Sequence, residues 1–187
     1  EDVVKGLPGD PADDQARFIA ATVVDGSLAV RVASLYLPNG NPAPGPKYDY
    51  KLAWMQRLKD FAAGAMKQEE PLVLCGDYNV IPEARDARFP ENWKDDALYL
   101  PQTRAAFREL ESIGLTEAYR ALHPLQTGAY SFWDYQAGAW QKDNGIRIDH
   151  HLLSPQAADR LQSVAIDKGL RAGEKPSDHV PIRLDLG

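Results

Sequence analysis

The chain has only one cysteine, Cys75, among its 187 residues, so it cannot form an internal disulfide. This excludes the class of small secreted domains that depend on disulfides for stability. The sequence also lacks a run of about 18 apolar residues, and it lacks a basic leader followed by an apolar segment. We therefore expect a cytoplasmic protein with no membrane partner. The first residue is Glu1 rather than Met, which indicates a processed or shortened N-terminus.

Positive charge is also scarce. The 27 Asp and Glu residues outnumber the 21 Lys and Arg residues, and the formal net charge is −6. Surfaces that bind nucleic acid are usually basic overall or carry a local basic stripe. A polyanionic substrate would therefore need a local cationic site or a divalent metal ion in this protein.

The composition that is present is that of an ordinary globular protein. Hydrophobic residues make up 44% of the chain, and 187 residues suffice for one domain with a substantial core. We expect a single domain over residues 1–187. Its first 16 residues are polar and acidic, and we expect them to form a flexible lead.

The hydrophobic pattern predicts an α/β fold. Two β-rich runs flank the turn signal Asp25-Gly26 and predict a hairpin. A helical spacing of apolar residues over 48–66 leads into a short buried run at 71–75, and a helix followed by a buried strand is typical of α/β proteins. The remaining predicted elements are a helix over 103–113 that ends at Gly114, strands over 146–153, 162–166 and 182–186, a short helix over 155–161, and a long irregular segment over 80–100.

The most informative stretch is residues 71–79, with the sequence PLVLCGDYN. It reads as a buried strand that runs into a turn, and ligands of α/β proteins lie outside the carboxyl ends of such strands. The Asp77 carboxylate can take a proton or hold a metal ion, and the Asn79 amide can donate to a phosphate oxygen. Tyr36, at the exit of the hairpin and close to Asn39, is a further candidate phosphate donor. An Asx turn explains the Asp and Asn equally well.

The last third of the chain adds an acid and a histidine. Asp149 lies in an otherwise apolar strand, where a lone buried carboxylate is costly and needs a partner. His179 is the economical partner, because a carboxylate raises the imidazole pKa and fixes its tautomer. Together with Asp178 and the residues near Asp77, this pair has the groups needed for metal-assisted hydrolysis of a phosphate ester.

Two other signals have less chemical weight. His150 and His151 do not predict a zinc site, because adjacent strand residues point to opposite faces. The aromatic residues over 130–140 mostly predict core or loop packing, although aromatics on a cleft loop can stack on a base or fill the gap left by a missing one.

Five segments in order carry a resemblance to a known family: YLPNG (36–40), GDYN (76–79), SFWDY (131–135), GIRIDH (145–150) and EKPSDH (174–179). They resemble exonuclease III, in the AP-endonuclease branch of the endonuclease/exonuclease/phosphatase superfamily. The match runs along nearly the whole chain. The SFWDY and EKPSDH segments favour this branch over other phosphatases of the superfamily.

The resemblance implies a DNA-repair nuclease that uses Mg²⁺ or Mn²⁺, removes nucleotides from 3′ ends of duplex DNA and cuts at abasic sites. It implies that Asp77 deprotonates the attacking water and that Asn79 holds the scissile phosphate. It also implies that His179, oriented by Asp149, stabilises the phosphate charge. The phosphate-contacting residue would be Tyr36, the metal ligands would be Asp178, Asp77 and Asn79, and the substrate-binding residues would be Asn39, Phe132, Trp133, Ile146 and Ile148.

The chain departs from the family at its start. Members begin with a strand that carries an Asn and a strand that ends in Gln-Glu, whose Glu is the main metal ligand, and residues 1–35 match neither. The resemblance therefore implies a two-sheet α/β sandwich that lacks its first strands and helix. We expect a partial domain with little or no activity, which self-associates through an exposed sheet face.

Two alternatives remain at this stage. One is a phosphatase of the same superfamily that acts on a small phosphoester, which the acidic charge mildly favours and the SFWDY segment opposes. The other is a non-catalytic binding module or folding fragment. Metal titration separates it from an enzyme, because a catalytic site should take up Mg²⁺ or Mn²⁺.

Overall fold

The computed structural model describes residues 1–187 and contains a six-stranded sheet in the order β1-β2-β3-β4-β6-β5. The strands β3 and β4 are parallel, and every other neighbouring pair in this sheet is antiparallel. A second sheet consists of the antiparallel pair β7 and β8. The strands are β1 (Val4–Lys5), β2 (Phe18–Asp25), β3 (Leu28–Tyr36), β4 (Leu72–Asp77), β5 (Thr116–Glu117), β6 (Asp149–Leu153), β7 (Leu161–Ile166) and β8 (Ile182–Leu186).

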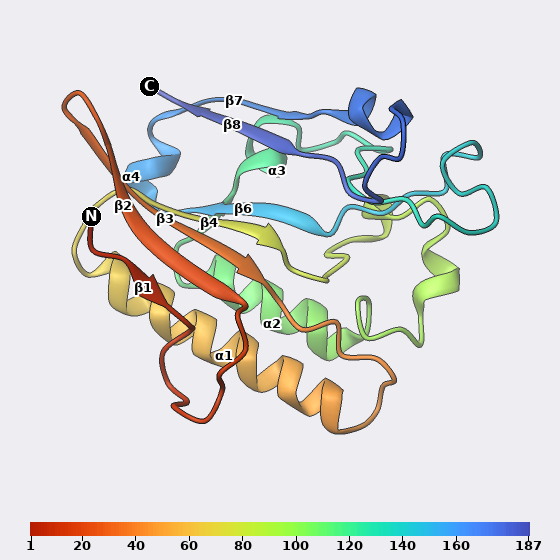
Figure 1. Cartoon of the computed structure of the whole chain (residues 1–187), viewed down its shortest axis with the longest axis horizontal. Helices are drawn as coiled ribbons and strands as arrows, with labels where there is room; N and C mark the ends of the chain where they lie inside the picture. Colours follow the sequence, from red (N-terminus) through yellow and green to blue (C-terminus); the bar gives the residue numbers. More distant parts are fainter.

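Two long helices cover one face of the large sheet, and the small sheet lies over the other face (Figure 1). The helix α1 has Pro46 in its first turn, where the missing N–H breaks no helical hydrogen bond. No helix of the chain is long and apolar enough to cross a bilayer. The helices are α1 (Pro46–Met66), α2 (Pro101–Ser112), α3 (Ala118–Leu122) and α4 (Pro155–Ala158), with 3-10 turns η1 (Ala84–Asp86), η2 (Pro90–Trp93) and η3 (Lys168–Ala172).

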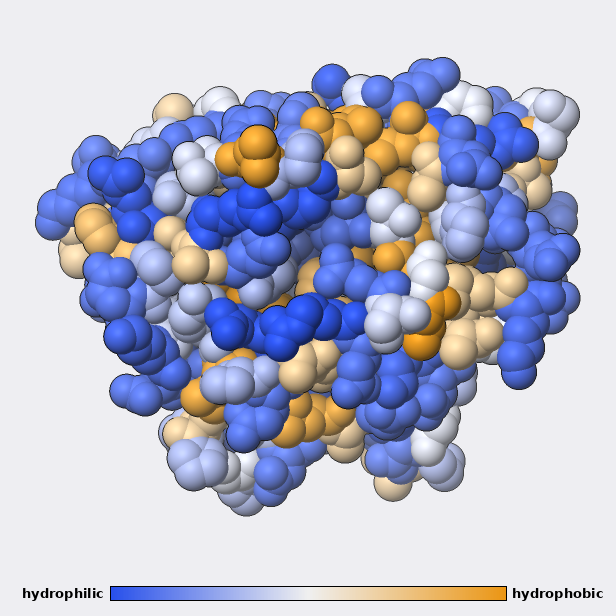
Figure 2. All heavy atoms as spheres, turned by 180° about the vertical axis from the view of Figure 1, so that it is seen from behind, coloured by the Kyte–Doolittle hydropathy of each residue, from blue (hydrophilic) through white to orange (hydrophobic).

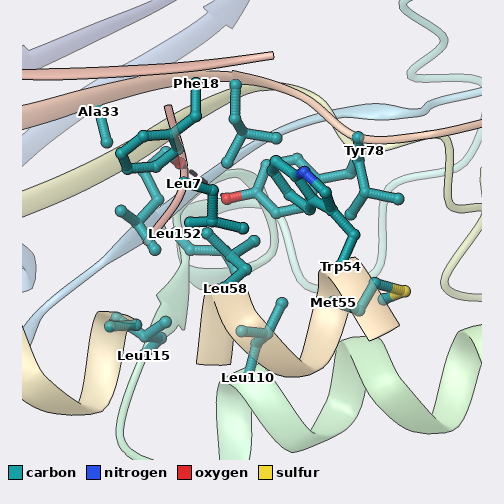
Figure 3. Packing of buried hydrophobic residues seen from close by; sticks show 14 of the residues in the cluster. Leu7, Phe18, Ala33, Trp54, Met55, Leu58, Tyr78, Leu110, Leu115 and Leu152 are labelled. Carbon is teal, nitrogen blue, oxygen red and sulfur yellow. Dashed lines mark hydrogen bonds between the residues drawn. The ribbon is translucent and has the colours of Figure 1, made fainter. Parts of the chain in front are cut away.

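The main core lies between the helices and the large sheet. Trp54 and Leu58 of α1 and Leu110 of α2 point toward Tyr78 and Leu152 at the sheet (Figure 3), and all five are almost completely buried. Burial of each such side chain contributes roughly 1.5–3 kcal/mol. A smaller cluster, which includes Val30, Val73, Leu153 and Val164, fills the space between the two sheets. The sheet therefore has an apolar layer on both faces, which fixes its strands relative to one another.

The face opposite to the view of Figure 1 is mostly hydrophilic, with hydrophobic patches that hydrophilic residues interrupt (Figure 2).

The predicted α/β fold, the hairpin, both long helices and the buried strand are confirmed. The prediction for residues 146–153 is wrong at its start. Regular strand begins at Asp149, because Ile146 instead forms isolated bridges to Phe132 and Ala87. The expected irregular segment over 80–100 contains η1 and η2. The elements β1, β5, α3 and η3 had no counterpart in the prediction.

Residues 1–16, expected to be a flexible lead, make contacts with the rest of the domain. The strand β1 pairs with β2, and Leu7 is buried in the main core. Asp13 accepts hydrogen bonds from Tyr50 and from Arg57 of α1, at 2.9 and 2.7 Å. These contacts oppose the expectation of a mobile segment, which stays a prediction.

Candidate active site

Three of the predicted site residues lie side by side at one edge of the large sheet. Tyr36 and Asp77 are register partners at the carboxyl ends of the parallel strands β3 and β4. Asp77 and Asp149 are register partners of the antiparallel pair β4 and β6. Residues that are far apart in the sequence therefore meet across three neighbouring strands, and this edge is the candidate active site.

The approach of β4 to β3 requires glycine at position 76. A Cβ at Gly76 would lie 1.9 Å from the carbonyl oxygen of Leu35, and its φ of +143° is one that other residues rarely adopt. Two residues later the chain turns at Asn79, which has a φ of +48°. Asn is among the residues that tolerate this left-handed conformation. The Gly-Asp-x-Asn sequence thus directs Asp77 and Asn79 to the same edge.

Hydrogen bonds of Asn79 hold this turn. Its backbone N–H donates to Asp77 Oδ1 at 2.8 Å, and its side-chain nitrogen donates to Asp77 Oδ2 at 3.1 Å and to the Leu37 carbonyl at 2.8 Å. The side-chain nitrogen of Asn39 donates to Asn79 Oδ1 at 3.2 Å. The amide of Asn79 therefore has both of its N–H groups engaged within the protein. In this state it orients Asp77, and its expected contact with a phosphate requires it to exchange one of these bonds.

The predicted pair of Asp149 and His179 is present, with Oδ2 of the acid 2.9 Å from Nδ1 of the imidazole. The other ring nitrogen, Nε2, lies 4.0 Å from Asp77 Oδ2. Phe132 packs edge-on against the imidazole at 5.0 Å between ring centroids, and the hydroxyl of Ser131 accepts from the Asp149 backbone N–H at 3.2 Å. The acid and the aromatic ring together fix the imidazole so that Nε2 faces Asp77.

Burial and charge shift the pKa values of this group of residues. Burial is the largest influence on Asp77, and together with the negative charge of Asp149 it raises the carboxyl pKa to about 7. For His179, burial acts to lower the imidazole pKa, but the hydrogen bond and charge of Asp149 outweigh it, and the pKa is raised. The site therefore combines a carboxyl group that titrates near neutrality with an imidazole whose pKa lies above its usual value.

A buried cation lies behind this edge. Lys51 of α1 is 0% exposed, and its ammonium group donates to the carbonyl oxygens of Asn39 and Asn79. Burial lowers the pKa of Lys51 to about 7, against the opposing influence of Asp77 and Asp96.

The donor set fits a divalent cation only in part. Asp77 and Asp149 are the two carboxylates that face each other at the site, but the structure contains no group of three or more His, Cys, Asp or Glu side chains arranged to hold a metal ion. The carboxylate of Asp178 accepts from the Ser177 hydroxyl, at 3.4 Å. Metal binding by the expected ligands Asp178, Asp77 and Asn79 stays a prediction.

The five expected substrate-binding residues divide by exposure. Asn39 is exposed and Phe132 is half-buried beside His179, so both are accessible from the site. The side chains of Trp133, Ile146 and Ile148 are 0%, 2% and 3% exposed. Trp133 packs against Tyr130 and Trp140, and the two isoleucines pack with a separate apolar cluster. These three residues are packed inside the protein in this structure, and their contact with substrate stays a prediction.

The sequence did not predict the roles of Lys51 or of a group of charged residues around Arg147. Lys51 is at helical spacing with the buried residues Trp54, Met55 and Leu58, and this spacing was the signal that it faces inward. The group of charged residues surrounds Arg147, whose guanidinium donates to Asp86 at 2.8 Å and to Glu117 at 2.9 Å. Its signal was a charged residue between Ile146 and Ile148, and the other members of the group are Arg120 and His150.

The chain is similar to known nucleases in its sequence and in its fold. A sequence profile of the Endonuclease/Exonuclease/phosphatase family matches residues 2–179. The chain is 32% identical over 185 residues to exodeoxyribonuclease III of Haemophilus influenzae, in a match that covers 95% of this chain and 69% of that protein. A match to the DNA repair nuclease APEX1 of Danio rerio has 32% identity over 184 residues and covers 98% of this chain and 56% of that protein.

Solved structures agree with these matches. The structure of the 3′ phosphatase NExo from Neisseria, bound to a product DNA hairpin, superposes with a TM-score of 0.94 and 38% identity, and covers 100% of this chain and 71% of that chain. An AP endonuclease from Archaeoglobus fulgidus superposes with a TM-score of 0.91 and 33% identity, and covers 100% of this chain and 70% of that chain.

Proposed function

The chain belongs to the Endonuclease/Exonuclease/phosphatase family, and on this premise we propose that it is a DNA phosphodiester hydrolase of the exodeoxyribonuclease III and AP endonuclease type. One observation supports the proposal above others. Asp77 lies beside Asp149 in register, and Asp149 holds the imidazole of His179 so that Nε2 faces Asp77. A base and an imidazole donor that face each other, with 4.0 Å between Asp77 Oδ2 and His179 Nε2, suit the hydrolysis of a phosphate ester.

In the proposed reaction Asp77 accepts the proton of the attacking water. A pKa of about 7 suits this role, because a general base works best when its pKa is near the working pH. Asn79 donates to both oxygens of Asp77 and so holds the carboxylate in one orientation. His179 donates from Nε2 to a phosphate oxygen as negative charge builds up there, and the hydrogen bond and charge of Asp149, acting against burial, raise the imidazole pKa, which is the direction that suits this role.

Tyr36 and Asn39 supply further phosphate contacts in this proposal. Tyr36 is 52% exposed, so its hydroxyl is free to donate to a phosphate oxygen. Asn39 is exposed in the turn that follows β3.

We propose Mg²⁺ or Mn²⁺ as the cofactor, which would neutralise phosphate charge when bound. Asp77, Asn79 and Asp178 are the residues available to hold it. Because no group of three acidic or histidine ligands is present, we expect weak metal binding and slow turnover by this chain. The corresponding measurement is the Mg²⁺ concentration that gives half-maximal cleavage, which we expect to be millimolar rather than micromolar.

The proposed substrate is duplex DNA with an abasic site or a 3′ end, in base excision repair. Removal of a 3′-terminal phosphate is a second candidate, which the similarity to the Neisseria 3′ phosphatase supports. Hydrolysis of a small phosphoester is the remaining alternative. Cys75 is a free, half-buried thiol, which fits a reducing compartment, and we propose the cytoplasm as the location.

We also propose that the chain self-associates through an apolar groove of about 470 Å³ between the large sheet and β8. Exposed apolar surface and open sheet edges favour association. Sedimentation at two protein concentrations measures it, and a monomer at both contradicts it. The groove is lined mainly by Val23, Val30, Val32, Val73, Leu184 and Leu186.

The test of the enzymatic proposal compares three substrates: abasic duplex DNA, duplex DNA with a 3′-phosphate, and a small sugar phosphate. Asp77→Asn removes the proposed base, and Asp159→Asn changes an exposed acid remote from the site. We expect hydrolysis of one or both DNA substrates that Asp77→Asn abolishes and Asp159→Asn leaves unchanged. Hydrolysis of the sugar phosphate alone would contradict the proposed DNA substrate.

A further inference from the structure

Lys51 occupies an unusual position for a lysine. It lies in the second turn of α1, its side chain is completely buried, and none of the ion pairs of the structure involves it. Its ammonium group instead donates to two backbone carbonyls, those of Asn39 at 3.0 Å and Asn79 at 2.6 Å. A buried ammonium that meets carbonyl dipoles rather than a carboxylate recovers only part of its lost hydration.

The two carbonyls belong to the two turns that form the edge of the candidate site. Asn39 follows β3, and Asn79 follows β4 in a left-handed backbone conformation. The side chains of the same residues are also linked, since Asn39 donates to Asn79 at 3.2 Å and Asn79 donates to both oxygens of Asp77. Lys51 therefore connects the two turns through their backbone carbonyls, while the asparagines connect them through their side chains.

The stem of Lys51 also shapes the first turn. A Cβ at Gly40 would lie 2.7 Å from Cδ of Lys51, and the φ of Gly40 is +93°. The turn that carries Asn39 thus rests directly on the lysine stem. An apolar side chain of similar length would fill this space without burying a charge, so packing alone does not account for a lysine at this position.

Resting on the function proposed above, we propose that Lys51 is a positioning residue of the active site: it holds the carbonyls of Asn39 and Asn79, and through them the orientation of Asp77, without touching the substrate. Groups that orient catalytic side chains affect the rate more than the binding of substrate, because small displacements of the reacting groups are felt mainly in the transition state.

The test compares Lys51→Met, which keeps the stem and removes the donor, with Lys51→Arg, which keeps a charged donor. Lys59→Met is the matched control, because Lys59 lies on the same helix and pairs only with Glu109 at the surface. For abasic duplex DNA we expect Lys51→Met to lower kcat by about 10- to 100-fold with a change in KM of less than about threefold. We expect Lys51→Arg to recover part of the rate and Lys59→Met to match the wild type.

A readout that does not need activity separates this inference from the proposed function. Hydrogen–deuterium exchange should quicken by about tenfold or more at the amides of residues 39–41 and 79–81 in Lys51→Met, and stay unchanged over residues 54–62 of α1. If the wild-type chain cuts no DNA but Lys51→Met still shows this faster exchange, the positioning role is supported and only the proposed function is contradicted. If Lys51→Met does not fold, Lys51→Leu, which also removes the donor, is compared with Lys59→Met by the same two measurements. Unchanged kcat and unchanged exchange in folded Lys51→Met or Lys51→Leu would overturn the inference.

Discussion

Replacement of Arg147 by Met should destabilise the protein strongly. The guanidinium is 1% exposed and pairs with two carboxylates that are themselves buried, Asp86 at 0% and Glu117 at 3% exposure. Removal of one partner from a buried ion pair costs about 3–5 kcal/mol, because it leaves an uncompensated buried charge. Asp86 retains a second partner in Arg120, so the cost falls mainly on Glu117. We therefore expect a loss of about 3 kcal/mol, the lower end of this range.

Urea unfolding at pH 7, followed by circular dichroism, measures this loss. The matched control is Arg183→Met, since Arg183 is 72% exposed and pairs only with Asp185 at the surface; its effect should stay within about 0.5 kcal/mol. Addition of Glu117→Gln to Arg147→Met should restore part of the stability, because it removes the orphaned charge. A loss below about 1 kcal/mol in Arg147→Met would refute the reasoning that the buried carboxylates depend on this arginine.

Three further predictions concern pH and backbone geometry. Burial opposes ionisation of Glu117, but the Arg147 charge lowers its folded pKa to about 2. About 3 kcal/mol of stability should therefore be present above pH 4.5 and be lost as the pH falls toward 2. A Glu117→Gln variant whose stability falls in the same way with acid would contradict this. Asp149→Asn should lower the pKa of His179 in an NMR titration, because it removes the bond and charge that raise it, and an unchanged pKa would exclude this coupling. Gly76→Ala should lower the free energy of unfolding in urea by about 3 kcal/mol or more, because the added Cβ meets a backbone carbonyl oxygen. Gly64→Ala, in an open position of α1, should raise it by up to about 1 kcal/mol. Equal effects of the two substitutions would argue against the close approach of β4 to β3.

Much of the fold could be predicted from local patterns. The hairpin followed from an Asp-Gly turn between two β-rich runs, and α1 followed from its helical spacing of apolar residues. The short elements β5 and α3 escaped prediction because two and five residues carry too little periodicity. The N-cap of α3 is Glu117, whose side chain accepts from the backbone N–H of Arg120. Such a cap is visible only once the chain has turned.

The candidate site shows the same division. An acid in an apolar strand needs a partner, and this argument alone predicted the contact of Asp149 with His179, which is present. The partners of Lys51 and Arg147 could not be predicted in this way, because the sequence does not show which carbonyls surround Lys51 or which acids surround Arg147. Trp133 shows the opposite difficulty. The resemblance implied that it binds substrate, whereas the loop aromatics alone predicted packing; in the structure it packs against two other rings and is fully buried, and its contact with substrate stays a prediction.

The proposal that Asp77, with His179 and Asp149, hydrolyses DNA phosphodiesters is tested by cleavage of a duplex oligonucleotide that carries one abasic site. Cleavage is measured with millimolar Mg²⁺ and with EDTA, for the wild type and for Asp77→Asn. We expect slow cutting that requires the metal and disappears in Asp77→Asn, although the variant remains folded. Cutting that survives Asp77→Asn, or a folded wild-type chain that neither binds nor cuts the oligonucleotide, would contradict it.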